Sequence, residues 1–157
     1  MHDPNLISLV HALEECNVKY VVIGGLALLI NGGAIVTSDI DLSIAFDKEN
    51  LVSFANALNQ FEPRSRNGSL VKLDLHAFGG EFVTMFTNVG IVQIINRVNG
   101  FSSFADLQTM SNKMAVNGTH VWVASLDALE IMKTNTGRDK DKPHLDIIRQ
   151  MKEKRNS

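Results

Sequence analysis

The sequence of 157 residues is poor in cysteine, proline and long apolar runs, and each scarcity excludes a class of protein. A single cysteine, Cys16, cannot close an internal disulfide, which argues against a disulfide-stapled secreted fold. Three prolines and 11 glycines are too few for collagen or a low-complexity chain. The longest apolar run, 21–30, is about half of the roughly 20 residues that a membrane-spanning helix needs. We therefore expect a cytoplasmic protein that does not enter a membrane.

The net charge is also small, because 15 basic and 17 acidic residues leave only −2 at pH 7. Such a chain has no overall attraction to nucleic acid or to an anionic membrane. The charge is nevertheless uneven, since residues 133–157 hold 8 of the 15 basic residues and 4 of the 17 acidic ones. We expect any phosphate-binding surface to draw on this C-terminal segment.

What the sequence does contain, 45% apolar residues in regular patterns, predicts one α+β domain spanning residues 1–157. Alternating or continuous apolar runs predict strands at 18–23, 39–44, 69–78, 82–86 and 91–95, and a hairpin of 114–116 with 121–123. Helical spacing predicts helices at 4–13, 26–30 and 47–58, and two closing helices within about 125–155. The expected architecture is a mixed β-sheet flanked by helices, with the two closing helices packed on it.

Asp39 and Asp41 form the first candidate site. They lie one residue apart on a predicted strand, so their side chains leave the same face with α-carbons about 7 Å apart. Two carboxylates this close repel one another, and a divalent cation is the usual way to keep both ionised. Mg²⁺ suits the pair because it is bound by few carboxylates together with water and phosphates. A solvated strand face is the alternative interpretation.

Gly24 and Gly25 form the second candidate site, between a buried strand and a short helix. Without a β-carbon the backbone can approach a ligand closely, and the amides that follow can bind phosphate oxygens. A tight strand-to-helix turn is the alternative. Neither G-x-G-x-x-G nor a P-loop is present in the sequence, which argues against Rossmann and Walker-type nucleotide sites.

Together, the buried strand, the glycine pair, thirteen intervening residues and Asp39-Ile40-Asp41-Leu42 resemble the signature of the DNA polymerase beta superfamily of nucleotidyltransferases. The later runs 121–126, 131–133 and 137–141 are similar to those of small AbiEii-like nucleotidyltransferases. The resemblance implies a nucleotidyltransferase fold over nearly the whole chain. It also implies Mg²⁺-dependent transfer of a nucleoside monophosphate from a triphosphate such as ATP, with release of pyrophosphate.

The resemblance also implies a role for particular residues. Mg²⁺ would bind Asp39 and Asp41, and the nucleotide would bind Gly24, Gly25 and Ser38. Lys133 and Arg138 would supply positive charge to the phosphates, with a solvated basic helix end as the alternative. Lys140 and Asp141 are expected to fix the junction of the last two helices, with Asp141 as an N-terminal cap.

A third carboxylate completes the catalytic site in this superfamily, and two residues compete for its position. Asp74 lies between two leucines, with His76 on the same face if 69–78 is a strand. The run 86–95, however, is similar to the family pattern "f.T..G.vDll" and places Gln93 at the acid. We favour Gln93, which is neutral and can neither act as a base nor supply anionic metal charge.

Gln93 motivates an alternative function, a weak or inactive nucleotide-binding domain in a toxin–antitoxin or defence system. The acceptor is not identified by the sequence; in the wider family it is a tRNA, a protein or a small molecule such as an antibiotic. A chain of this length has little room for an acceptor domain. A homodimer or a partner protein is therefore expected to complete the cleft.

Overall fold

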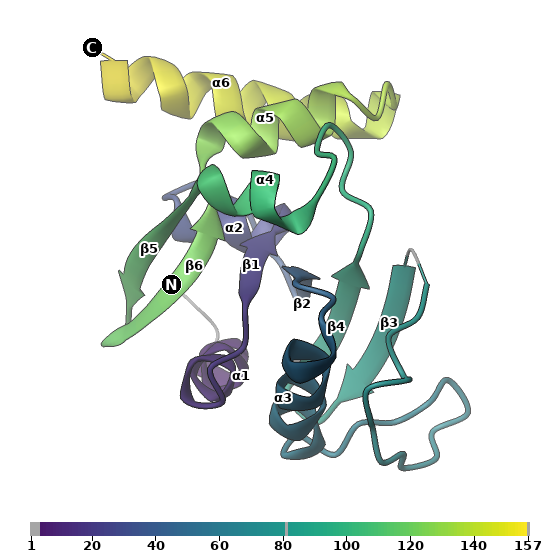
Figure 1. Ribbon diagram of the computed structural model, residues 1–157. Coiled ribbons are helices and arrows are strands. Elements are labelled where there is room, and N and C mark those ends of the chain that lie inside the picture. The colour runs from purple at the N-terminus through teal and green to yellow at the C-terminus, as the bar shows by residue number, and fades with distance from the viewer. Residues whose placement is uncertain (1–3, 81, 157) are drawn as a thin grey trace.

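The computed structural model describes residues 4–80 and 82–156, and its core is a six-stranded mixed sheet with strand order β3-β4-β2-β1-β6-β5 (Figure 1). The strands are β1 (Tyr20–Ile23), β2 (Asp39–Ile44), β3 (Phe82–Thr87), β4 (Gly90–Ile95), β5 (Ser111–Val116) and β6 (Thr119–Ala124). The helices are α1 (Pro4–Glu15), α2 (Gly24–Ile30), α3 (Lys48–Asn59), α4 (Phe104–Thr109), α5 (Leu126–Thr134) and α6 (Lys142–Asn156), with a 3-10 turn η1 (Asp139–Asp141). The predicted α+β class is confirmed.

The sheet places the two predicted carboxylates beside the centre of the fold. β1, buried along its whole length, pairs antiparallel with β2 and parallel with β6. In β2, Ile40 and Leu42 are buried while Asp39 and Asp41 are only half-buried, as the alternation predicts. β2 pairs parallel with β4, and the register sets Asp41 opposite Gln93. The face that carries Asp41 therefore also carries Gln93.

The two closing helices hold the basic residues against this sheet. Ser125 caps α5 by accepting a hydrogen bond from the Ala128 amide at 3.1 Å. α5 contacts α2, β6 and α6, and α6 lies along α5 (Figure 1). Near the end of α6, the Arg155 guanidinium donates to the carbonyl oxygen of Asn31, a buried residue just after α2, at 2.9 Å. No helix in the described part of the chain is long and apolar enough to cross a membrane.

The strand predicted at 69–78 is wrong. This segment forms turns, in which Asp74 Oδ1 accepts a hydrogen bond from the His76 amide at 2.8 Å. The Asn59 side chain bonds both the amide and the carbonyl of Leu73, at 2.9 Å each, so these groups need no strand partner. Leu73 and Phe78 are buried, which shows that the apolar residues here cover the core from a turn-rich loop.

Two smaller predictions also need correction. α2 begins at Gly24, two residues before the predicted start. α4 was not predicted, because its six residues contain one buried side chain, Leu107, and so carry no helical periodicity. Ser103 caps α4 through a hydrogen bond from the Asp106 amide at 3.1 Å.

Candidate active site

A cavity of about 360 Å³ lies where β1, β2, β3 and β4 meet the α5–α6 junction. Five of the sequence-predicted site residues line it: Gly24, Asp41, Gln93, Lys133 and Arg138. Arg97 and Lys140 add positive charge, and Phe82, Ile95 and Met132 are among the apolar lining residues. The described part of the cavity wall thus combines one carboxylate, four cations and apolar side chains.

Gly24 makes the close approach of Asp41 possible. Its φ of +69° lies in the left-handed region, which side chains with a β-carbon adopt only with strain. A β-carbon at Gly24 would also overlap the Asp41 carboxylate. At Gly25 a β-carbon would lie 3.1 Å from the Thr37 hydroxyl oxygen, so this position is crowded as well. Glycine is therefore favoured at position 24 by both backbone conformation and packing, and at position 25 by packing alone.

The carboxylate of Asp41 is partly buried and is not fully hydrogen-bonded by the described residues. Its Oδ1 is buried and has no hydrogen-bond partner among the described residues. Burial, together with the negative charge of Asp39, raises the pKa of Asp41 to about 6, although the positive charge of Lys133 opposes the rise. A buried acceptor without a hydrogen bond lowers the stability of the folded state, and a bound cation would offset this loss.

Asp39 and Ser38 are close to Asp41 in the chain, but neither residue lines the cavity. Asp39 is half-buried, on the same face of β2 as Asp41. Its Oδ1 accepts a hydrogen bond from the Ser38 hydroxyl at 3.3 Å. Ser38 is exposed and Gly25 is also absent from the cavity wall, so the structure brings these residues near the cavity without placing them in its lining.

The oxygen donors present fit Mg²⁺ bound by two carboxylates. Within residues 4–80 and 82–156, no group of three or more His, Cys, Asp and Glu side chains could hold a metal ion. Asp39 and Asp41 nevertheless share one face, and Asp41 Oδ1 is unsatisfied. Mg²⁺ commonly takes one or two carboxylates and completes its shell with water and substrate phosphates. The pair is therefore sufficient for such a site, with the remaining ligands supplied by water and the nucleotide.

Gln93, rather than Asp74, lies beside Asp41. The parallel pairing of β2 with β4 sets the two residues opposite each other, and both line the cavity. Asp74 is exposed in the turn-rich loop and does not line the cavity. The residue that the β2–β4 pairing sets opposite Asp41 is thus an amide and not a carboxylate.

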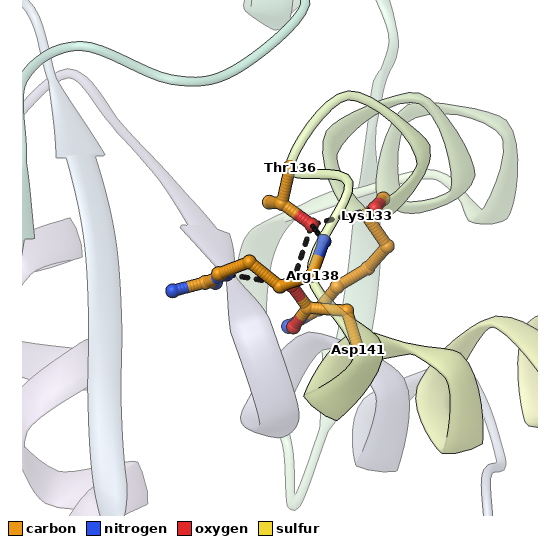
Figure 2. Close-up of polar contacts among 4 residues, drawn as sticks. All are labelled: Lys133, Thr136, Arg138 and Asp141. Carbon is orange, nitrogen blue, oxygen red and sulfur yellow. Dashed lines mark hydrogen bonds and ion pairs between the residues drawn. The ribbon is translucent and has the colours of Figure 1, made fainter.

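Lys133 and Arg138 are held by a buried carboxylate, Asp141, as Figure 2 shows. Lys133 Nζ lies 3.0 Å from Asp141 Oδ1, and Arg138 Nε lies 2.9 Å from Asp141 Oδ2. The Thr136 hydroxyl donates to the same Oδ2 at 2.5 Å. Asp141 is only 3% exposed. Both cations are therefore anchored in the cavity wall by one carboxylate, although the Arg138 side chain is 52% exposed.

Asp141 does fix the junction of the last two helices, but not as the predicted N-terminal cap. Burial alone would raise its pKa; the hydrogen bonds from Thr136, Lys133 and Arg138 outweigh burial and hold its pKa well below the usual range. Asp141 consequently stays ionised and keeps both cations in place. Lys140, expected only at the helix junction, also lines the cavity.

Arg97 and Phe82 are among the lining residues that sequence reasoning missed. Arg97 comes two residues after the end of β4 and four after Gln93, so its position just beyond this strand was the available signal. Phe82 is the first residue of β3 and is 56% exposed. An aromatic residue at the start of a strand does not by itself indicate a binding site, so Phe82 could be recognised only once the cavity was located.

Comparison with known proteins identifies the fold. No protein-family model and no curated protein matches the chain. Three solved structures superpose over most of it. The proposed nucleotidyltransferase TM1012 of Thermotoga maritima matches with a TM-score of 0.61 at 19% identity, covering 89% of this chain and 87% of that one. The lincosamide adenylyltransferase LnuA, solved with lincomycin, matches with a TM-score of 0.65 at 11% identity, covering 96% and 98%.

A nucleotidyltransferase-like protein from Paracoccidioides brasiliensis has a TM-score of 0.58 at 20% identity, covering 94% of this chain and 74% of that one. At these identities the likeness concerns the fold. The chain therefore has the nucleotidyltransferase fold, as the resemblance of its sequence implies.

Replacing Gly24 by Ala is expected to lower the free energy of unfolding by about 3 kcal/mol, because left-handed strain adds to the overlap with Asp41. Gly68→Ala is the matched control, since its φ is +86° and nothing lies within 4 Å of a β-carbon there. It should lose only about 1 kcal/mol. Equal losses for the two variants in urea unfolding would show that Gly24 is not packed against Asp41.

Proposed function

We propose that the protein is a Mg²⁺-dependent nucleotidyltransferase, which moves a nucleoside monophosphate from a triphosphate such as ATP to a hydroxyl-bearing acceptor and releases pyrophosphate. The observation that supports this most directly is the buried, unsatisfied oxygen of Asp41, in the same cavity as Lys133 and Arg138. A lone carboxylate would repel a triphosphate; a carboxylate that binds a cation, with two further cations in the wall, would attract one. Mg²⁺ bound by Asp39 and Asp41 would neutralise phosphate charge as it develops.

The chain's own residues supply binding and orientation. Lys133 and Arg138, anchored by Asp141, bind the outer phosphates and stabilise the negative charge on the departing pyrophosphate. Because these cations are held before the ligand arrives, little ordering of the side chains is needed at the moment of reaction. Because Gly24 has no β-carbon, the Asp41 carboxylate and the phosphates can both lie close to its backbone.

The structural neighbours are consistent with this proposal. LnuA is an adenylyltransferase solved with lincomycin, and ANT(2'')-Ia, a neighbour with a TM-score of 0.51 at 13% identity, was solved with adenylyl-2''-tobramycin. One was thus solved with an antibiotic and the other with an adenylylated antibiotic. We extend only the kind of reaction to this chain. Candidate acceptors to be tested are tRNA, proteins and small molecules, and a second copy or a partner protein would complete the cleft.

Labelled nucleotides test the reaction directly. The purified protein would be incubated with Mg²⁺ and each NTP carrying label at the α-phosphate or at the γ-phosphate, together with tRNA, cell lysate or aminoglycosides. Transfer of α-label to an acceptor, with γ-label recovered as pyrophosphate, supports nucleotidyl transfer. γ-Label on the acceptor would instead indicate a kinase. No transfer from either position would exclude the proposed reaction for those acceptors.

A second candidate, nucleotide binding without turnover, is favoured by Gln93 beside Asp41. The amide can orient an acceptor hydroxyl by a hydrogen bond but does not take up its proton at neutral pH. If binding is the function, calorimetry should show NTP affinity that depends little on Mg²⁺. Strong metal-dependent turnover by the wild type would exclude it.

Replacing Gln93 by Asp should raise transfer about 10-fold or more, because it adds a base and a third anionic ligand next to Asp41. The same variant should gain more thermal stability from Mg²⁺ than the wild type, since three neighbouring carboxylates repel one another more strongly than two. Gln108→Asp, at an exposed position of α4, is the matched control and should change neither property. Unchanged turnover and unchanged stabilisation by Mg²⁺ in Gln93→Asp would show that Gln93 does not face the metal.

A further inference from the structure

A second cavity, of about 230 Å³, adjoins the active-site cavity, because Arg97 and Val98 line both. On β2, Asp41 lines the active-site cavity and Ser43 lines the second cavity. These two residues are separated by one residue of the strand, so they share a face and their α-carbons lie about 7 Å apart. A ligand in the second cavity would therefore lie beside the proposed metal and nucleotide site.

The polar groups of the second cavity suit a ligand that carries hydroxyls. Asn96, in the cavity lining, is held in place because its Nδ2 donates to the carbonyl oxygens of Phe78 and Gly80, at 3.1 and 2.5 Å. The Oδ1 of Asn96 is buried and has no hydrogen-bond partner among the described residues. Ser43 adds a hydroxyl from a residue that is 3% exposed. A ligand hydroxyl both donates and accepts, so it can pair with either group.

The charge of the second cavity is positive. Arg97 lines it, and none of the described lining residues is acidic. Asp106 accepts a hydrogen bond from the Ser102 hydroxyl but does not itself line the cavity. In the active-site cavity, the carboxylate of the described lining is Asp41, which is proposed to bind Mg²⁺. An acceptor with ammonium groups would thus lack a carboxylate partner in the described lining, whereas an anionic group would be attracted to Arg97.

Resting on the proposed function, we infer that the second cavity binds the acceptor, and that the acceptor is a small phosphorylated sugar. Its hydroxyls pair with Asn96 and Ser43, and its phosphate pairs with Arg97. The volume equals that of about eight water molecules at about 30 Å³ each, which is room for one sugar ring. In the transfer, an acceptor hydroxyl oxygen bonds to the α-phosphorus as the bond from that phosphorus to the β-phosphate oxygen breaks. Pyrophosphate leaves, and the hydroxyl proton passes to water.

Three sugars that differ only at carbon 6 test the charge preference: glucose 6-phosphate, glucose and 6-amino-6-deoxyglucose. Each would be titrated by calorimetry in the presence of Mg²⁺ and saturating α,β-methylene-ATP, a nucleotide that resists transfer. The nucleotide then occupies Lys133 and Arg138, so a preference for phosphate reports on a different cation. The wild type should bind glucose 6-phosphate about 10-fold more tightly than glucose, and the amino sugar more weakly than glucose.

Two variants separate the charge from the hydroxyl contacts. Arg97→Gln should lower the affinity for glucose 6-phosphate about 10-fold, to the level of glucose, and leave the affinity for glucose unchanged. Ser43→Ala should weaken both sugars alike and keep the preference between them. Arg66→Gln is the matched control for Arg97→Gln, since Arg66 is exposed and lines neither cavity. It should bind all three sugars as the wild type does.

The outcomes distinguish this inference from the proposed function. Equal affinities for the three sugars, no binding of any of them, or a phosphate preference that survives in Arg97→Gln would overturn the acceptor inference while the proposed function stands. Displacement of the nucleotide by glucose 6-phosphate would overturn it as well, since the phosphate would then bind in the active-site cavity. If the wild type does not bind α,β-methylene-ATP with Mg²⁺, the proposed function fails, and the acceptor inference fails with it.

Discussion

Replacing Asp41 by Asn is expected to lower nucleotidyl transfer by about 10²–10³-fold and, at the same time, to make the metal-free protein more stable. Transfer falls because an amide does not supply the negative charge that holds Mg²⁺ next to the phosphates. Stability rises because the amide removes a negative charge that burial and the nearby Asp39 disfavour. Few substitutions change activity and stability in opposite directions, so the pair of effects is diagnostic of a functional carboxylate.

The stability gain of Asp41→Asn has a defined pH dependence. The pKa of Asp41 is raised from 3.8 to about 6, so its charged form is disfavoured in the folded state. The penalty is absent below the ordinary pKa and complete above the raised one. In EDTA the variant should gain about 1–2 kcal/mol at pH 7, a figure reduced for partial exposure, and nothing at pH 3.

Asp146→Asn, at an exposed position of α6, is the control for Asp41→Asn and should change neither stability nor transfer. Thermal unfolding at the two pH values and the α-label assay give both readouts. Mg²⁺ should raise the midpoint of the wild type more than that of Asp41→Asn. A variant that is less stable than the wild type in EDTA would contradict the unsatisfied state of this carboxylate.

Replacing Asp141 by Asn is expected to lower the free energy of unfolding by about 2–3 kcal/mol and the midpoint of thermal unfolding by about 5–10 °C. The buried carboxylate accepts charge-assisted hydrogen bonds from Lys133 and Arg138, and an amide would turn a donor toward one of them. The loss is below that of a fully buried pair because the Arg138 side chain is 52% exposed. Nucleotide affinity should fall as well, because both cations lose their anchor.

The contribution of Asp141 also depends on pH. Its pKa is held well below the usual range, so its stabilisation is complete above the ordinary value of 3.8 and is lost as the pH falls through the lower folded-state pKa. The difference between wild type and Asp141→Asn should therefore be largest near pH 7 and narrow at pH 3. Asp139→Asn, two residues before Asp141, removes an exposed ion pair with Lys142 and should cost less than about 0.5 kcal/mol. Equal losses for the two variants would show that Asp141 does not anchor the junction.

The sequence was sufficient to predict those features of the fold and the site that depend on residues close together in the chain. Asp39 and Asp41 alternate with buried residues along one strand, so their shared face follows from strand geometry alone. The glycine pair that follows the buried strand is a local signal as well, although the sequence placed the start of α2 two residues too late. The helix predicted at 47–58 has a local signal too, since Asp47 precedes α3 and caps it by accepting a hydrogen bond from the Asn50 amide. These features depend on neighbours in the chain and not on distant pairing.

The sequence was insufficient to predict those features that depend on contacts between segments far apart in the chain. Alternation at 69–78 is compatible with a strand, but Leu73 and Phe78 reach the core from turns that Asp74 and Asn59 stabilise. Gln93 lies next to Asp41 because β4 pairs with β2 across about fifty residues of chain, so the local pattern did not indicate this neighbour and only the family resemblance suggested it. The anchoring of Lys133 by Asp141 likewise requires the fold of the α5–α6 junction.

A crystal structure with Mg²⁺ and α,β-methylene-ATP tests the central proposal most directly, because it locates metal and nucleotide in one experiment. We predict Mg²⁺ bound by the carboxylates of Asp39 and Asp41, the outer phosphates against Lys133 and Arg138, and Gln93 facing the α-phosphate without binding the metal. A nucleotide bound outside this cavity, or bound in it with no metal at Asp41, would contradict metal-dependent nucleotidyl transfer at this site.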